Sequence, residues 1–172
     1  MLVSLFTLLI CNVAIAKDDF TFAVIGDPQT DGDHDSINWD ILPPLIDSIN
    51  QASPASLLVA GDLIDGSYSN SGAISQWEDF NTAIGHFKGD VWMVPGNHDV
   101  YSGSGAFDAW RQTFPWLPTD DSPAGEEGVS YYIDHGDTRF VFITSDGPSQ
   151  YGYVSTEGLK WLDRVLSESD SA

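Results

Sequence analysis

Basic residues and cysteine are scarce in this sequence. Its 172 residues contain six Lys or Arg against 26 Asp or Glu, which gives a formal net charge of -20. Binding to a nucleic-acid backbone requires a basic face, so the composition argues against it. The acidity instead predicts a solvated acidic surface. The only cysteine, Cys11, lies within the first 16 residues, and a chain cleaved after Ala16 would have neither disulfides nor thiolate chemistry.

Long hydrophobic runs are also absent, apart from residues 1–16 (MLVSLFTLLICNVAIA). This run ends in Ala14-Ile15-Ala16, the small-x-small pattern that signal peptidase accepts, and charged residues follow at once. It predicts a signal peptide over 1–16 and a secreted or periplasmic protein with no transmembrane span in the mature chain. A buried N-terminal strand or a short anchor is the alternative. No Lys or Arg precedes the run, so the true start could lie upstream.

Several catalytic signatures are missing as well. The sequence has no G-x-S-x-G nucleophile elbow, no Walker loop and no G-x-G-x-x-G. Hydrophobic residues make up 42% and aromatic residues 12% of the chain, which is typical of a globular protein. We therefore expect residues 17–172 to form one domain with a sizeable core. The sequence gives no indication of the oligomeric state.

The remaining chain alternates apolar runs with helix-like segments. Runs typical of buried strands occupy 20–27, 56–62 and 91–97, and amphipathic helices are predicted over 44–51 and 74–87. This alternation indicates right-handed crossovers and a parallel sheet. Farther on, residues 129–146 predict an antiparallel hairpin, and 155–169 predict a closing helix. The glycine-rich residues 101–107 predict a flexible lip beside the third strand.

Each of the three predicted parallel strands runs into a polar cluster, GDPQ, GDLID and GNHD in turn. Loops at the carboxyl ends of parallel strands converge on one crevice, so these clusters should meet in space. Together they offer oxygen ligands that suit hard to borderline divalent metals, namely Asp27, Gln29, Asp62 and Asn97. A single Gly-Asp pair is an ordinary turn, but three such clusters in series predict a metal site.

The series resembles the signature of the calcineurin-like metallophosphoesterase superfamily, which runs D-x-H, GDxxD, GNH[DE] and then further histidines. The matching residues are Asp27, Asp62, Asp65, Asn97, His98 and Asp99. The resemblance covers residues 20–166 and implies the family's fold, a four-layer α/β/β/α sandwich. This chain would be the N-terminal part of that sandwich, with a mostly parallel sheet and an antiparallel hairpin.

The resemblance also implies an activity and roles for single residues. The family hydrolyses phosphoric esters with two divalent metal ions and a water that bridges them. Asp27 would hold one metal, Asp62 would bridge both, and Asn97 would hold the second. His98 would be catalytic as proton donor to the leaving group, oriented by the carboxylate of Asp65. The expected substrate is a small phosphorylated molecule with a monoester, diester or diphosphate bond.

One departure from the signature concerns the metal. Gln29 stands where many relatives have histidine, and an amide oxygen is a weaker and harder ligand than an imidazole nitrogen. Mn²⁺ is therefore the first expectation, with Fe or Zn²⁺ as alternatives. A D-x-Q variant is similar to the Mn-dependent ADP-ribose and CDP-alcohol diphosphatases.

A second departure concerns the family's remaining metal histidines, in H-H-x-P and G-H-x-H motifs, which this chain lacks. Its other histidines, His34, His86 and His135, stand in different contexts. The domain is thus predicted to be incomplete at its C-terminus, and residues 17–172 alone are not expected to hydrolyse phosphate esters. Two interpretations stay open: the N-terminal part of an exported phosphoesterase, or a catalytically inactive remnant that binds metal weakly.

Overall fold

The computed structural model describes residues 20–30, 37–147 and 151–169 of the chain. The predicted signal peptide over 1–16, with Cys11, and His34 lie outside the described residues. Whether the domain begins at residue 17 therefore stays a prediction. Among the described residues, no helix is long and apolar enough to cross a membrane.

Strands and helices alternate through the first two thirds of the described chain, and a hairpin and a last helix follow. The elements are β1 (Phe22–Ile25), α1 (Leu42–Gln51), β2 (Ser56–Ala60), α2 (Asn70–Ile84), β3 (Asp90–Val94), α3 (Ala106–Thr113), β4 (Tyr131–His135), β5 (Thr138–Phe142) and α4 (Thr156–Ser169).

The first three strands form a parallel sheet in the order β1-β2-β3. Ile25 is in register with Val59, and Val59 with Met93, so these three buried side chains lie on one face of the sheet. The crossover helices cover that face, and Ile46 of α1 and Trp77 of α2 are fully buried in the same core. The parallel sheet predicted from the alternation is confirmed.

The antiparallel hairpin β4–β5 packs on the other side of the parallel sheet. Phe22 of β1 and Phe140 of β5 make an edge-to-face contact with ring centroids 5.0 Å apart. The Tyr131 hydroxyl accepts a hydrogen bond from the Met93 backbone N–H at 2.9 Å and donates one to the Met93 carbonyl at 2.7 Å. A single hydroxyl thus satisfies two backbone groups on the outer edge of β3, which would otherwise be buried without partners.

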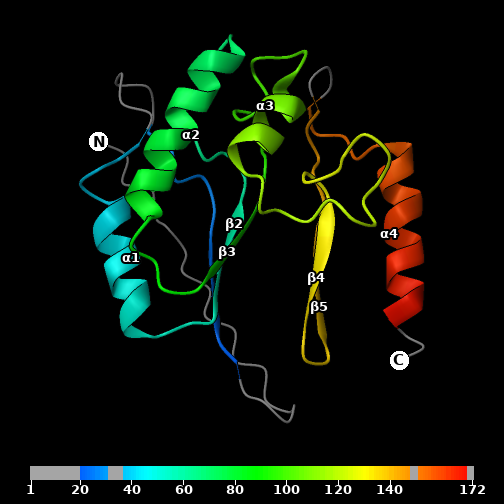
Figure 1. Cartoon of the computed structure of the whole chain (residues 1–172), viewed down its shortest axis with the longest axis horizontal. Helices are drawn as coiled ribbons and strands as arrows, with labels where there is room; N and C mark the ends of the chain where they lie inside the picture. Colours follow the sequence, from blue (N-terminus) through cyan, green and yellow to red (C-terminus); the bar gives the residue numbers. More distant parts are fainter. Residues whose placement is uncertain (1–19, 31–36, 148–150, 170–172) are drawn as a thin grey trace.

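Helix α4 lies on the far side of the hairpin and completes the sequence of layers. Its Trp161 and Val165 are buried, and Arg139 of β5 donates to the Val165 carbonyl at 3.3 Å. The Ser155 hydroxyl caps the helix by accepting from the Gly158 N–H at 2.8 Å. Figure 1 shows the order of layers as α1 and α2, the parallel sheet, the hairpin, then α4, which confirms the predicted α/β/β/α arrangement.

The segment predicted as a flexible lip, 101–107, leads into a helix that the sequence analysis missed, α3 (Ala106–Thr113). Helix α3 begins at Ala106 and places Ala106, Ala109 and Trp110 in the interior. The Trp110 ring meets Trp77 of α2 edge-on, with centroids 5.5 Å apart. The sequence analysis missed this helix because glycine-rich residues precede it. Gly105 ends a turn at φ 88°, and the short apolar face of the helix follows at once.

Candidate functional site

The polar residues that follow β1, β2 and β3 lie together at the carboxyl ends of these strands. The Asp27 backbone N–H donates to the Gly61 carbonyl at 3.2 Å, which joins the first loop to the second. The His98 backbone N–H donates to Oδ1 of Asp62 at 2.9 Å, which joins the second loop to the third. Residues from three distant parts of the sequence therefore converge, as expected for a parallel sheet.

Unusual backbone conformations aim the two aspartates. Asp27 and Asp62 both have a φ of 50°, in the left-handed region that residues other than glycine seldom adopt. Each follows a glycine at the end of its strand. Gly96 allows the third loop to approach Asp62, because a Cβ on Gly96 would lie 2.3 Å from Asp62 Oδ1. The close packing of these loops thus requires glycine at position 96.

Gln29 braces the first two loops from within. In the orientation that satisfies its hydrogen bonds, its side-chain nitrogen donates to the backbone carbonyls of Asp62 at 2.5 Å and of Asp27 at 3.3 Å. Its backbone also forms an isolated antiparallel bridge with Ile37. With its nitrogen engaged in this way, Gln29 has only its amide oxygen left as a metal donor.

His98 is oriented by a different atom from the one expected. Its Nδ1 lies 2.6 Å from the backbone carbonyl oxygen of Asp65, whereas the resemblance implied the Asp65 carboxylate. The physical reason is the turn at Gly66, whose φ of 102° directs the preceding peptide carbonyl toward the imidazole. A carbonyl can only accept, so Nδ1 carries the hydrogen and Nε2 is the nitrogen free to act on a substrate.

Asp99 joins the second and third loops from beneath, a role that the motif alone did not reveal. Its carboxylate is fully buried and accepts from the backbone N–H groups of Leu63 at 3.2 Å and Gly96 at 2.9 Å. It also accepts from the Trp77 indole at 2.9 Å. Burial raises the pKa of Asp99 to about 7, although the three N–H donors favour its charged form. The signal for this role was Trp77 itself, a buried indole that needs an acceptor.

Negative charge accumulates around Asp62. Partial burial is the main cause that raises the pKa of Asp62, and repulsion from the carboxylates of Asp27 and Asp146 adds to it. The N–H and ring of His98 act in the opposite direction. Asp146, which follows β5, is itself buried and accepts from the Gly152 N–H at 2.7 Å. Asp146 thus belongs to the same region as Asp27 and Asp62.

The basic side chains of the described residues do not neutralise this charge. The ion pairs formed by arginine and lysine are Arg111 with Asp108 and Glu127, Arg139 with Asp134, Arg164 with Asp121 and Glu168, and Lys160 with Glu157. Lys88 lies between α2 and β3, at the amino end of that strand. The carboxylates at the loops therefore have no arginine or lysine partner among the described residues.

The donor set fits part of a metal site. The Asp27 carboxylate and the Asn97 amide make no hydrogen bond to another described residue, which leaves their oxygens available, and the Asp27 carboxylate is close enough to Asp62 to raise its pKa. Hard divalent ions take such carboxylate and amide oxygens. Within 20–30, 37–147 and 151–169, however, no group of three His, Cys, Asp or Glu side chains is arranged to hold a metal. Asp27 and Asp62 would thus need the amides of Gln29 and Asn97, and further ligands.

The other described histidines lie at the opposite end of the sheet. His86 follows α2, with its Nε2 3.2 Å from the Pro43 carbonyl oxygen and 3.1 Å from an Asp47 carboxylate oxygen. His135 ends β4, and its ring lies against Phe20, with centroids 4.2 Å apart and planes tilted by 46°. Neither is placed to complete the ligand set, as the sequence analysis inferred from their contexts. His34 lies outside the described residues.

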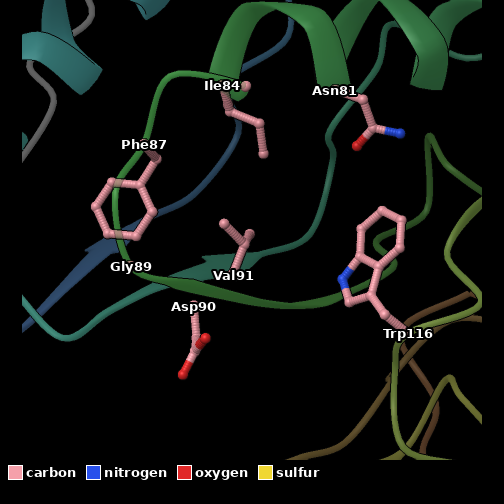
Figure 2. Close-up of a pocket in the computed structure, with 8 residues that line it drawn as sticks. Asn81, Ile84, Phe87, Gly89, Asp90, Val91 and Trp116 are labelled. Carbon is pink, nitrogen blue, oxygen red and sulfur yellow. The ribbon is translucent and has the colours of Figure 1, made fainter.

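A surface hollow of about 470 Å³ lies at the amino end of β3 and contains none of the motif residues. Figure 2 shows Phe87 and Trp116 on either side of Val91, with Ile84 and Asn81 of α2 above them. The single carboxylate of this lining, on Asp90, points away from the others. The hollow has apolar walls and no converging polar groups, so the candidate site is the loop cluster at the carboxyl ends.

Comparisons with known proteins identify the family and the fold. The sequence matches the calcineurin-like phosphoesterase family over residues 20–170. A search of curated proteins found no match. Among solved structures, the fold is similar to that of purple acid phosphatase from yellow lupin (Lupinus luteus) seeds, with a TM-score of 0.58 and 16% identity. The similarity covers 87% of this chain and 30% of the lupin protein, so this chain spans less than a third of that length. The family match extends over most of the chain, and the protein therefore belongs to the calcineurin-like phosphoesterase family.

Proposed function

We propose that this protein is the N-terminal part of an exported, metal-dependent phosphoesterase that hydrolyses monoester, diester or diphosphate bonds of small phosphorylated molecules. The family and the fold are those of hydrolytic phosphoesterases. The observation that carries the proposal is the contact between the His98 N–H and Asp62 Oδ1 at 2.9 Å. It sets an imidazole beside a carboxylate cluster that has no basic partner among the described residues.

Two divalent ions would be held by four side chains of this chain, Asp27, Gln29, Asp62 and Asn97. Further ligands from outside this set would complete their coordination. When bound, such ions acidify water and neutralise the charge on phosphoryl oxygens. We propose Mn²⁺ first, because all four side chains offer oxygen donors. Fe and Zn²⁺, which accept imidazole more readily, are the alternatives.

His98 would supply the leaving-group proton. Its Nδ1 hydrogen is held by the Asp65 carbonyl at 2.6 Å, so the ring cannot rotate freely and Nε2 keeps one direction. In the protonated ring, Nε2 carries a hydrogen that can pass to the ester oxygen as its bond to phosphorus breaks.

Export rests on the leader over 1–16 and is proposed on the sequence alone. It can be tested by expressing the complete gene product and sequencing the N-terminus of the extracellular or periplasmic protein. A mature chain that starts at Lys17 would support cleavage after Ala16. Retention of residues 1–16 in the cell-associated protein would contradict it.

The proposed activity is tested with the complete gene product and a metal-dependence assay. Hydrolysis of p-nitrophenyl and bis-p-nitrophenyl phosphate should require added Mn²⁺ and should be lost in Asp62→Asn. Asp108→Asn, in an exposed ion pair of α3, is the matched control and should retain activity. Metal binding measured by calorimetry gives a second readout that does not depend on turnover.

The inactive remnant is the second candidate, favoured by the absence of a three-residue metal cage among the described residues. It predicts weak metal binding and no hydrolysis, even for the complete gene product. Metal-stimulated hydrolysis that Asp62→Asn abolishes would exclude it. Reading the gene beyond codon 172 supplies an independent test, because a continuing frame with H-H-x-P and G-H-x-H motifs favours the enzyme.

A further inference from the structure

A row of tyrosine rings runs beside His98 across loops that follow three different strands. The Tyr101 ring meets the His98 imidazole edge-on, with centroids 5.2 Å apart and planes at 85°. Tyr68 and Tyr151 each lie 6.0 Å from Tyr101, centroid to centroid. Tyr68 follows β2, Tyr101 follows β3, and Tyr151 follows β5. We call Tyr68, Tyr101 and Tyr151 the tyrosine row.

The tyrosine row is exposed, unlike the aromatic rings of the core between α2 and α3. Tyr68 is 92% exposed, Tyr101 38% and Tyr151 51%, whereas Trp77 and Trp110 are buried in the core. Burying large rings is a main source of stability, so Tyr68 and Tyr151, each more than half exposed, contribute less to folding than the core rings do. Exposed apolar clusters of this kind mark binding surfaces.

The backbone beneath the row is shaped to accept Tyr101. A Cβ on Gly66 would lie 2.8 Å from Tyr101 Cδ2, so the ring rests against the bare glycine backbone. Gln76 of α2 holds this glycine through both its N–H, at 3.1 Å, and its carbonyl, at 3.0 Å. Tyr101 is thus supported from below, and its ring presents a fixed surface next to His98.

We propose that the tyrosine row binds an aromatic ring carried by the leaving group of the substrate. The inference rests on the proposed function, in which His98 faces the leaving-group oxygen. A group bonded to that oxygen would extend past the imidazole toward Tyr101. The three side chains of the tyrosine row are uncharged, so stacking rather than charge would distinguish one leaving group from another there. The substrates are therefore phosphoesters whose leaving alcohol carries an aromatic ring, either an aryl group or a nucleobase.

The test compares esters that differ only in aromaticity. Benzyl phosphate and cyclohexylmethyl phosphate have similar size and primary-alcohol leaving groups, so a stacking surface is needed to separate them. For the complete gene product with Mn²⁺, we expect kcat/KM to favour the benzyl ester by roughly 5- to 150-fold, the range that base stacking on an aromatic side chain gives. Adenosine 5′-monophosphate against ribose 5-phosphate forms the nucleobase arm and identifies the source of the ring.

Substitutions in the tyrosine row test which side chains cause the preference for the benzyl ester. Tyr101→Leu should abolish it, and Tyr68→Leu, at a side chain too exposed to affect folding, should reduce it. Tyr153→Leu is the matched control, since Tyr153 is 52% exposed on the same loop as Tyr151 but makes no ring contact with a described residue, and it should keep the full preference. A fall in rate that is equal for both esters would mean that Tyr101 only positions His98, and would contradict the proposal.

Binding without turnover separates the two proposals. Benzylphosphonate and cyclohexylmethylphosphonate cannot lose their organic group by ester hydrolysis, and their affinities can be compared by calorimetry. Tighter binding of the benzyl compound, lost in Tyr101→Leu, would support the proposed role of the tyrosine row even without hydrolysis of either ester. The lack of hydrolysis would then contradict only the proposed function. Equal affinities, or a preference unchanged by both tyrosine variants, would overturn the tyrosine row.

Discussion

The indole Nε1 of Trp77 donates to Oδ1 of Asp99 at 2.9 Å, and this buried contact connects the helical layer to the loops that carry the candidate site. The other oxygen of Asp99 accepts the N–H groups of Leu63 and Gly96. Helix α2 and the loops after β2 and β3 are therefore held by one carboxylate. The positions of Asp62 and His98 depend on a residue that touches no substrate.

Asp99→Asn should destabilise the protein and weaken the site together. An amide nitrogen would face an N–H group where a carboxylate oxygen now accepts, which leaves a buried donor without a partner. We expect the free energy of unfolding to fall by about 2 kcal/mol or more. Trp77→Phe removes one donor to Asp99 and keeps an aromatic ring. Apart from the effect of altered packing, its free energy of unfolding should therefore fall by less than that of Asp99→Asn. Urea denaturation of both variants measures the difference, and an unchanged midpoint for Asp99→Asn would contradict the bracing role.

Gly96→Ala should displace Asp62 without a general loss of folding. Its Cβ would lie 2.3 Å from Asp62 Oδ1 and 2.7 Å from the Asp62 nitrogen, so the two loops must separate. We expect weaker metal binding and lower activity, measured by calorimetry and by ester hydrolysis. Gly26→Ala is the control, because its Cβ would meet only ordinary contacts at 3.7 Å. Equal effects of the two substitutions would show that the spacing of these loops is not critical.

Tyr131→Phe should destabilise the contact between the sheet and the hairpin. The buried hydroxyl bonds both to the N–H and to the carbonyl of Met93, and phenylalanine would leave both groups unsatisfied. Each such group costs about 1–3 kcal/mol. Tyr132→Phe is a suitable comparison, since its exposed hydroxyl makes only a 3.4 Å contact with Asp121. Thermal unfolding should separate the two variants clearly, and similar melting temperatures would refute the role of the hydroxyl.

Gln29→His should change the metal preference of the complete gene product from Mn²⁺ toward Zn²⁺ or Fe, because imidazole is the softer ligand. Gln29→Ala would remove both the amide oxygen and the bonds to the carbonyls of Asp62 and Asp27. If Gln29 serves only as a brace, Gln29→Ala should lower stability while Gln29→His leaves the metal profile unchanged. Activity across a metal series, with a denaturation curve for each variant, distinguishes the two roles.

Much of the fold could be predicted from the sequence, because each level of the pattern agreed. Alternating strands and helices specify a parallel sheet, and a parallel sheet brings GDPQ, GDLID and GNHD to one end. Helix α3 was missed because glycines precede it and its buried face has only three residues, Ala106, Ala109 and Trp110. Its stability comes from tertiary contact with Trp77, which no local pattern reveals.

The candidate site was predicted less completely than the fold. Residue types suggested ligands and a proton donor, but the partner of each polar atom depends on backbone turns. The turn at Gly66 brings the Asp65 carbonyl, not its carboxylate, to His98. The motif included Asp99, but it did not predict that the Asp99 carboxylate would be buried and would accept from three N–H donors. Contacts between residues on different elements decide both cases, His98 with Asp65 in the first and Asp99 with Leu63 and Trp77 in the second.

The central claim is that the loops around Asp62 and His98 catalyse phosphoester hydrolysis, and the most direct test is the leaving-group dependence of the reaction. In the complete gene product with Mn²⁺, kcat/KM should be measured for wild type and His98→Ala across esters whose alcohols differ in acidity. The account predicts a loss on the order of 100-fold or more for alkyl esters, which need a proton, and a much smaller loss for p-nitrophenyl esters, which do not. An equal loss for all esters, or no metal-dependent hydrolysis by the wild-type protein, would contradict it.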